Sequence, residues 1–513
     1  MKVKHTALAA ALAVGVSAGA QNYIDAIRFN QNTIEGTARS QAMGSAFGAL
    51  GADLSSAVIN PAGMGSYRAT EIGLSFGVNY QTAESNCYGY TKEDDKIAVP
   101  FNQIGAAFTF GLIRENTKGI ISQTLSIGYT RLADYNSRAF YADYYGANSL
   151  LDYFCSDAVK YNNYSGNLAY NAYLTDDQYI SSTDTIDITY NVWEKVNSDG
   201  TLDSSARFET DDDGNDVGLI DKKKYVRQKG YKGETNISYA MNVSNFVYIG
   251  LGIGIQSLYY EEKTLHSESY YGTPAERDIT SFDYNTELKQ NGTGINLKFG
   301  VILKPINELR IGLALHTPTF YSINEKYHTY ISHNGSGTLY SSPRGEYDYD
   351  YRSPGRFVAS IAGVAGSIGI LSFDYERCNF GNSKFKDQDD DITDEFDDIN
   401  DELKEVLTST NTYRVGLEIR ALNPVYIRGG YKLTTSPMED NYVVNDFKQQ
   451  AISGGLGFRQ DNFFIDLAYI YNTSESDYWV LPGSSDTYIY ETNSPAKLET
   501  TNHNFVITAG FRF

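Results

Sequence analysis

Residues 247–256 read VYIGLGIGIQ. Every second residue from Val247 to Ile255 is a branched aliphatic, and the residues between them are glycines except for Tyr248. Successive side chains of a strand point to opposite faces of its sheet. This period of two residues therefore predicts a β-strand with one aliphatic face and one face of small or polar residues.

The same alternation recurs along the chain after residue 68, for example at 295–301 and 413–420. We count fourteen strands of this kind, near 69–81, 101–113, 119–135, 230–243, 246–262, 283–303, 308–332, 350–363, 367–385, 410–421, 424–434, 446–459, 462–474 and 500–513. Two folds accommodate them. In a soluble sandwich the aliphatic faces meet a second sheet, and in a membrane barrel they meet lipid.

The connections favour the barrel. Every second connection is a tight turn, such as Ser244-Asn245 or Gln460-Asp461, whereas the others are long, above all 136–229. An even number of strands with short turns on one rim and long polar loops on the other is the plan of an outer-membrane barrel. The predicted fold is all-β: a 14-stranded antiparallel transmembrane β-barrel over residues 69–513, closed because lipid cannot satisfy a strand edge.

The composition excludes other classes. The 513 residues include 43 Tyr, 25 Phe and 2 Trp, too many aromatic residues for a disordered chain. After the first twenty residues, no apolar run is long enough for a membrane-spanning helix. The formal net charge of -21 argues against a nucleic-acid partner, because phosphates would be repelled.

Both ends of the chain suit export to the outer membrane of a Gram-negative cell. Residues 1–20 have two lysines, a short apolar stretch and the small-residue site Ala18-Gly19-Ala20, which together predict a secretory signal peptide. A buried N-terminal helix is the alternative. The last strand alternates up to Phe513, and outer-membrane assembly machinery recognises a terminal aromatic residue of this kind; a buried terminal strand is the alternative.

The segment before the first strand predicts a plug. Residues 36–67 read GTARSQAMGSAFGALGADLSSAVINPAGMGSY, a stretch rich in small residues with scattered Met, Leu, Val and Phe. Asp53 can cap a short turn that begins at Leu54, and Pro61 keeps Asn60 out of helical geometry. We predict that residues 21–68 form a compact hatch inside the barrel.

This segment resembles the N-terminal hatch of the FadL family, the long-chain fatty acid and hydrocarbon transporters of Gram-negative outer membranes. Asn60-Pro61-Ala62 matches the family's Asn-Pro-Ala, and Ala42-Met43-Gly44 precedes it as in the family. Stretches such as 315–320 and 425–431 resemble the Bacteroidetes branch. The resemblance implies a plugged fourteen-stranded barrel for passive transport. The implied hatch-motif residues are Gly44, Gly48, Asp53, Asn60, Pro61, Ala62 and Gly63.

Candidate ligand-binding residues lie in and after the extracellular loop 386–409. Residues 392–407 place apolar side chains on one helical face, namely Ile392, Phe396, Ile399, Leu403 and Leu407. This helix could line a hydrophobic entrance groove or act as a lid on the barrel mouth. Arg414 points to the lumen by parity and could receive a substrate carboxylate, although lumen charges usually pair with one another.

Other features predict no catalytic centre. The sequence has no Gly-x-Ser-x-Gly motif and no plausible Ser/His/acid set, so we expect no enzyme. The acidic run 211–216 departs from the EF-hand pattern, and a solvated loop explains it and the run 389–391. The spacing of His316, His328 and His333 matches no zinc motif. We therefore expect no metal and no cofactor.

The predicted function is passive outer-membrane transport of hydrophobic compounds through capture in an extracellular apolar groove and rearrangement of the hatch. The resemblance implies that these compounds are long-chain fatty acids. Its expected partners are this ligand, outer-membrane lipid, lipopolysaccharide and the assembly machinery, and the expected state is a monomer. Two alternatives stay open. One is an outer-membrane phospholipase, and the other is a plugged porin-like or adhesion barrel that transports no lipid.

Overall fold

This computed structural model describes residues 22–513 except 112–117, 147–148, 151–174, 180–185, 191–207, 211–215, 219, 271–279, 335–337, 367, 389–395, 423, 441–448 and 482–494. The predicted signal peptide, Ile392 and most of the two acidic runs lie outside the described residues. Within the described part of the chain, no helix is long and apolar enough to cross a bilayer.

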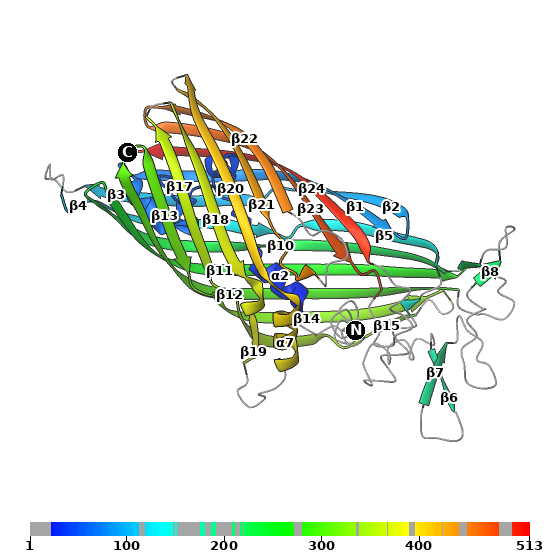
Figure 1. The fold of residues 1–513 in the computed structure, drawn as a ribbon. Helices are drawn as coiled ribbons and strands as arrows, with labels where there is room; N and C mark the ends of the chain where they lie inside the picture. Colours follow the sequence, from blue (N-terminus) through cyan, green and yellow to red (C-terminus); the bar gives the residue numbers. More distant parts are fainter. Residues whose placement is uncertain are drawn as a thin grey trace.

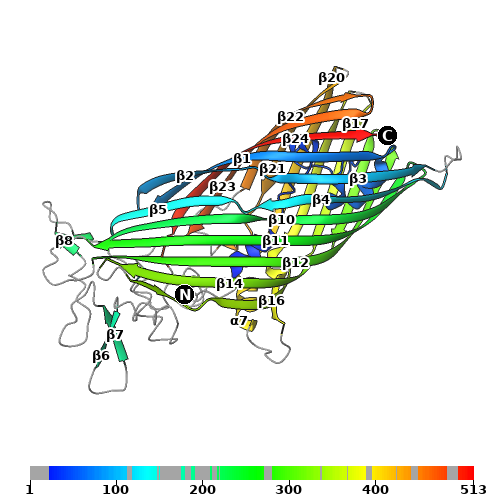
Figure 2. The same cartoon turned by 180° about the vertical axis from the view of Figure 1, so that it is seen from behind.

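The strands form one closed antiparallel barrel of fourteen strands (Figures 1 and 2). Closure is direct, because β1 (Glu71–Cys87) pairs with β24 (Ala496–Arg512) over almost its whole length. On β1 the residues Ile72, Leu74 and Phe76 are exposed outward, and the alternate residues are buried inward. The predicted 14-stranded barrel is therefore confirmed, and an apolar outer face explains the alternation that predicted it.

Nine of the fourteen wall strands are continuous. Besides β1 and β24 they are β10 (Ile220–Val243), β11 (Val247–Tyr270), β12 (Ser281–Ile306), β20 (Ser409–Leu422), β21 (Val425–Thr434), β22 (Gln449–Gln460) and β23 (Phe463–Tyr478). Short pairs outside the wall are β6 (Thr175–Tyr179) with β7 (Ile186–Tyr190) and β8 (Phe208–Thr210) with β9 (Asp216–Gly218). A further short strand, β15 (Leu339–Ser341), pairs with β14.

The other five wall strands are each broken once. They are β2/β3 (Tyr90–Ala98, Phe101–Gly111), β4/β5 (Ile120–Asp134, Ser137–Gly146), β13/β14 (Leu309–His316, Phe320–His333), β16/β17 (Gly345–Arg352, Arg356–Ala365) and β18/β19 (Gly369–Asn379, Lys384–Asp387). Pro100, Pro318 and Pro354 occupy three of the breaks. Proline cannot donate a ladder hydrogen bond, so a strand that contains it pairs as two segments.

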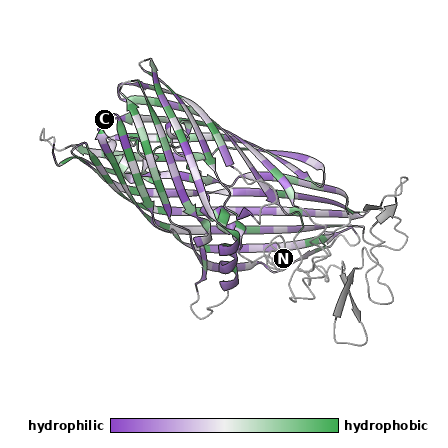
Figure 3. Cartoon of the chain, viewed as in Figure 1, coloured by the Kyte–Doolittle hydropathy of each residue, from purple (hydrophilic) through white to green (hydrophobic). Residues whose placement is uncertain are grey.

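The barrel is cut obliquely, because β10, β11, β12 and β14 run far beyond the rest of the wall (Figure 1). We predicted one long loop over 136–229, and this boundary was wrong: β5 and the start of β10 lie within that range. Figure 3 shows hydrophobic residues on the wall near the C-terminus, whereas α7 (Asp397–Val406) is hydrophilic. Beyond the membrane both faces of a strand carry polar residues, so the alternation that marks a lipid-facing strand disappears.

The N-terminal segment lies inside the ring of strands (Figure 1). It contains α2 (Tyr23–Asn30), α3 (Ala38–Ala42), α4 (Ser56–Ile59) and η2 (Pro61–Ser66), which contact β10, β11, β12, β22 and β23. A Cβ on Gly250 would lie 2.3 Å from the backbone N of Ala62, and one on Gly430 would lie 2.2 Å from the N of Gly44. Inward-facing glycines therefore let the hatch backbone contact the wall directly.

Candidate functional site

The lumen is closed near the short turns by the hatch, which an ion-pair network fastens to the wall. Arg39 of α3 donates to Glu418 of β20 through Nε at 2.9 Å and Nη2 at 3.0 Å. Arg428 of β21 binds the same carboxylate at 2.6 Å and also binds Asp466 of β23 at 2.6 Å. All four side chains are buried, so two cations and two carboxylates balance their charge away from water.

The Asn-Pro-Ala motif forms the start of η2. The Asn60 side chain accepts from the Ala62 N–H at 3.1 Å and donates to the Gly48 carbonyl at 2.6 Å, so it caps η2 and ties two turns of the hatch together. Pro61 fills the first position of η2, where a missing N–H costs nothing.

The other predicted hatch residues lie nearby. Gly48 donates its N–H to Asp374 of β18 at 2.8 Å. Asp53 accepts from the Thr37 hydroxyl at 2.8 Å and from the N–H of Ser55 at 2.9 Å, so it caps the turn before α4. Gly44 has a φ of 61°, which a residue with a Cβ rarely adopts. A Cβ on Gly63 would lie 2.9 Å from the Gly51 Cα.

An aromatic cluster fills the outer half of the lumen between α2 and α7. We call it the outer cluster, and its buried rings are Tyr23, Phe29, Tyr135, Tyr260, Tyr321, Tyr349, Tyr351, Phe380, Phe385 and Phe396. Three of the predicted stripe residues, Phe396, Leu403 and Leu407, are buried in this cluster, and Ile399 packs against it. The stripe therefore faces inward, and α7 covers the cluster as a lid.

The lid also carries a titratable group. Burial, with a smaller contribution from the neighbouring Glu405 carboxylate, raises the pKa of Glu402 to about 7. A carboxylate oxygen of Glu402 is buried without a hydrogen-bond partner among the described residues. The Glu402 side chain is therefore expected to change its charge near neutral pH.

Beneath the outer cluster, two cations of the wall hold the C-terminal end of α2. Lys232 of β10 donates to the Phe29 carbonyl at 2.8 Å, and Arg356 of β17 donates to the Asn30 carbonyl. Arg356 also pairs with Glu376 at 2.8 Å. The last carbonyls of a helix lack partners within it and carry about half a negative charge, which explains why cations gather there.

These cations line a cavity that links the outer cluster to the hatch. Phe29 and Tyr321 border it on the cluster side and Val58 on the hatch side, with Lys232 and Arg356 between them. Most of its remaining lining residues are polar, and they include Lys298, Glu234 and His316. The cavity therefore lies between the packed outer cluster and the hatch, and Lys232, Arg356 and the Lys298–Glu234 ion pair belong to its lining.

Arg414 lies deeper, on β20. Its side chain is 2% exposed, and Nη2 binds Glu376 at 2.7 Å. The atoms Nε and Nη1 have no hydrogen-bond partner among the described residues. The structure thus shows the ion pair that the sequence left open as the alternative, together with two unused donors.

The wall is incomplete where β2/β3 and β4/β5 break. β3 pairs with β4 only as far as Gln103↔Thr130. The following residues of β4 still pair with β10 on one side but have no partner from β3 on the other. The hatch covers this edge from inside: Thr33 N–H donates to the Leu132 carbonyl at 2.7 Å, and Glu35 N–H donates to the Arg131 carbonyl at 2.8 Å.

A small cavity lies in the wall beside this break. Its lining includes Glu35 and Gln41 from the hatch and Val78 and Phe505 from the lipid-facing side. Outside it lies an apolar groove of about 520 Å³, which shares Val78 and Phe505 and includes the exposed Val99. The groove gives the cavity an apolar continuation toward the membrane.

Sequence reasoning missed Arg39, Lys232 and Arg356 as site residues. Lys232 shares its parity with the inward-facing Asn236 and Ser238, and this signal could have found it. Arg39 carries no local signal, because its partner Glu418 is 379 residues away. Among the described residues, no three His, Cys, Asp or Glu side chains gather as a metal site.

A closed barrel with an apolar outer face, a polar lumen and an internal hatch is a multi-pass transmembrane barrel of the outer-membrane type. No protein-family model and no curated protein matches the sequence.

Solved structures identify the fold as FadL-like. A Pseudomonas aeruginosa FadL homologue is 13% identical with a TM-score of 0.53, covering 93% of this chain and 98% of its own. The P. putida toluene transporter TodX is 11% identical with a TM-score of 0.50, covering 93% and 99%. The CymD monoaromatic hydrocarbon channel is 11% identical with a TM-score of 0.50, covering 94% and 99%. These likenesses establish the fold.

Proposed function

We propose that this protein is a passive outer-membrane channel for hydrophobic compounds and that long-chain fatty acids are its ligands. The observation that supports this ligand is that apolar and cationic side chains meet at one cavity in the lumen. The aromatic rings of the outer cluster border this cavity through Phe29 and Tyr321, and the cations Lys232 and Arg356 line it. A fatty acid has a matching pair of an apolar tail and an anionic head.

Capture begins at the outer cluster. Movement of α7 exposes apolar surface that includes Phe396, Ile399, Leu403 and Leu407, and the acyl chain replaces these contacts. Each methylene that leaves water contributes about 0.8 kcal/mol, so a long chain binds without any covalent step.

The head group then releases the plug. A carboxylate carries a full charge, whereas the end of α2 offers only about half of one, so the carboxylate competes for Lys232 and Arg356. Once the cations bind the ligand, α2 loses the contacts at its C-terminal end. Arg414 offers two further donors deeper in the lumen.

The ligand leaves sideways in this proposal. Displacement of Thr33–Glu35 uncovers the edge of β4, and the cavity beside it leads to the apolar groove on the outer face. A fatty acid that follows this path passes from the lumen into the membrane, where its chain stays out of water.

Binding and transport by the full chain in proteoliposomes test the proposal. Lys232→Met should lower oleate affinity about tenfold, as expected for loss of one charge-assisted contact, and leave toluene affinity unchanged. Lys404→Met is the matched control, because Lys404 is exposed on α7 and makes only a local pair with Asp401. Equal losses for oleate and toluene would contradict a head-group role for Lys232.

The same proteoliposomes separate this function from its alternatives. A plugged porin would admit sugars and cause osmotic swelling, and an adhesion barrel would move neither sugars nor oleate. Transport of toluene without oleate would show a neutral-hydrocarbon channel, for which the outer cluster alone would suffice.

A further inference from the structure

Five segments, β5, β10, β11, β12 and β14, form a sheet that continues beyond the lipid-facing part of the wall (Figure 2). On β12 the outward residues Ile295, Leu297 and Phe299 are apolar, whereas Asn291, Lys289 and Glu287 follow toward the long loops. The register is continuous from β10 to β12, so outward residues remain outward along the whole sheet.

Two rows of outward residues on this sheet are rich in cations. The first row pairs Arg138 with Arg227 and Arg227 with Lys263, and the second pairs Lys289 with Lys326. We call the cations of these rows the basic face: Arg138, Arg227, Lys229, Lys263, Lys289 and Lys326. Glu261 and Glu287 stand in the same rows on these strands, and Glu346 ends the second row on the neighbouring β16.

The arrangement is unfavourable without an anion. Like charges directly opposite each other destabilise a strand pair. Three of these cations are paired: Lys263 with Glu287 at 2.6 Å, Lys229 with Glu261 at 3.4 Å, and Lys326 with Glu346 at 2.9 Å. Arg138 and Arg227 have no ion-pair partner among the described residues. The chain has 63 acidic and 42 basic residues, so its composition does not explain a face with excess cations.

The height of the basic face indicates what lies against it. The apolar belt of β11 ends at Ile255, and Lys263 follows eight residues later, about 26 Å along the strand at the usual rise. With the usual strand tilt, this places the two rows roughly 15–20 Å above the belt. In the outer leaflet, the phosphorylated inner-core sugars of lipopolysaccharide occupy this zone.

Aromatic rings accompany the cations. Phe140 stacks on Tyr225 with ring centroids 4.2 Å apart, beside Arg138 and Arg227. Tyr231 and Tyr259 lie between the belt and the basic face, with centroids 6.4 Å apart. Aromatic faces pack against the apolar faces of sugar rings, while the cations bind phosphate.

We propose that the basic face binds the phosphorylated inner core of lipopolysaccharide and thereby holds the extended sheet within the sugar layer. The occupant follows from charge complementarity and from position directly above the belt. This site is separate from the lumen and does not depend on the proposed transport.

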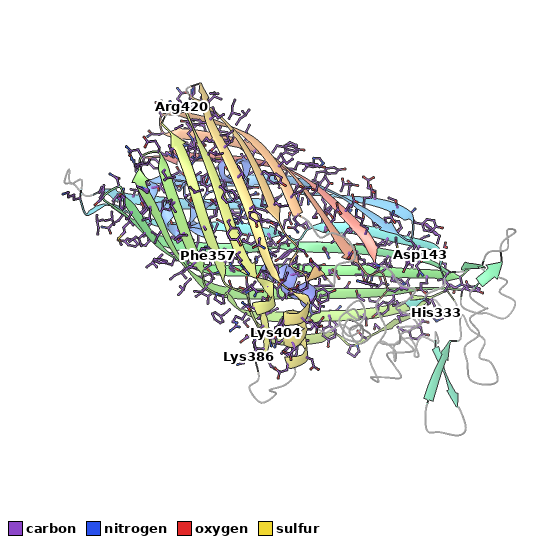
Figure 4. The ribbon with its side chains drawn as sticks, in the orientation of Figure 1. Asp143, His333, Phe357, Lys386, Lys404 and Arg420 are labelled. Carbon is purple, nitrogen blue, oxygen red and sulfur yellow. The ribbon has the colours of Figure 1, made fainter. Side chains whose placement is uncertain are left out.

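The test uses the full chain, purified in detergent free of lipopolysaccharide, and labelled lipopolysaccharide with an intact inner core. Arg138→Gln/Arg227→Gln/Lys263→Gln should lower affinity at least tenfold. Dephosphorylated lipopolysaccharide should bind wild-type protein with a similar loss. The control Lys118→Gln/Lys304→Gln/Arg420→Gln removes the same charge at the short turns; Arg420 lies at the opposite end of the barrel from Asp143 (Figure 4).

A measurement of thermal stability tests whether the triple variant is folded. Without lipopolysaccharide the triple variant should be at least as resistant to heat as wild type, because substitution removes like-charge pairs. Wild-type affinity in a folded triple variant would overturn the proposal. Equal wild-type affinities for intact and dephosphorylated lipopolysaccharide, or for phosphatidylglycerol, would overturn it as well.

Discussion

Substitution of Arg39 by methionine should loosen the hatch. Arg39 is the only member of the buried ion-pair network that belongs to the hatch, and its partners Glu418, Arg428 and Asp466 belong to the wall. Methionine removes both hydrogen bonds to Glu418 and leaves Arg428 as the one cation paired with this carboxylate among the described residues. The hatch keeps its apolar contacts and its other polar contacts with the wall, such as Glu35 with Arg131 at 3.2 Å, and loses the anchor at α3.

The size of the effect follows from the burial of the network. Removal of one partner of a buried ion pair costs about 3–5 kcal/mol, and the lower end applies because Arg428 still contacts Glu418. A loss of about 3 kcal/mol raises the population of the displaced hatch roughly a hundredfold. Native-state hydrogen exchange measures this directly, because amides of α3 exchange only when the hatch opens.

The double variant Arg39→Met/Glu418→Met separates charge from packing. It leaves Arg428 paired with Asp466, so its hatch should exchange more slowly than that of Arg39→Met alone. Arg420→Met is the control, because this side chain is exposed at the short turns. Wild-type exchange of α3 in Arg39→Met, or faster exchange in the double variant, would refute the anchoring role.

Two further perturbations address the hatch and the lid. Gly250→Val places side-chain atoms where the N of Ala62 lies, so it should displace η2 and raise single-channel conductance in a planar bilayer while the barrel still folds; unchanged conductance would contradict this contact. The Glu402 pKa is raised from 4.5 to about 7, so α7 should dock most firmly below pH 4.5 and loosen as the pH rises through 7. Exchange of α7 amides, corrected for intrinsic rates, should show this loosening in wild type and not in Glu402→Gln.

The strands could be predicted wherever one face of the strand meets lipid and the other face meets the lumen. The alternation at 247–256 reflects lipid outside and the hatch inside, and Gly250 is small because the Ala62 backbone touches it. Beyond the lipid the same strands carry Lys263 and Tyr259 outward, and no apolar period marks them. The start of β10 at Ile220 was therefore hidden.

The lumen contacts were harder to predict because they join distant parts of the chain. The helical stripe identified the buried face of α7, although the helix spans Asp397–Val406 and Leu407 pairs instead with Met438. The sequence offers no pattern for α2, since eight residues leave little periodicity. Its place becomes evident only when Lys232 and Arg356 meet its last carbonyls.

Through the contact of Thr33–Glu35 with the edge of β4, the hatch takes the place of a missing strand segment in the barrel wall. When it departs, the exposed carbonyls of Arg131 and Leu132 need water as a substitute, since hydrocarbon offers none. An open state is therefore hydrated and short-lived. The rate at which Thr33–Glu35 pairs with β4 again limits how much small polar solute leaks through the barrel during each transport event.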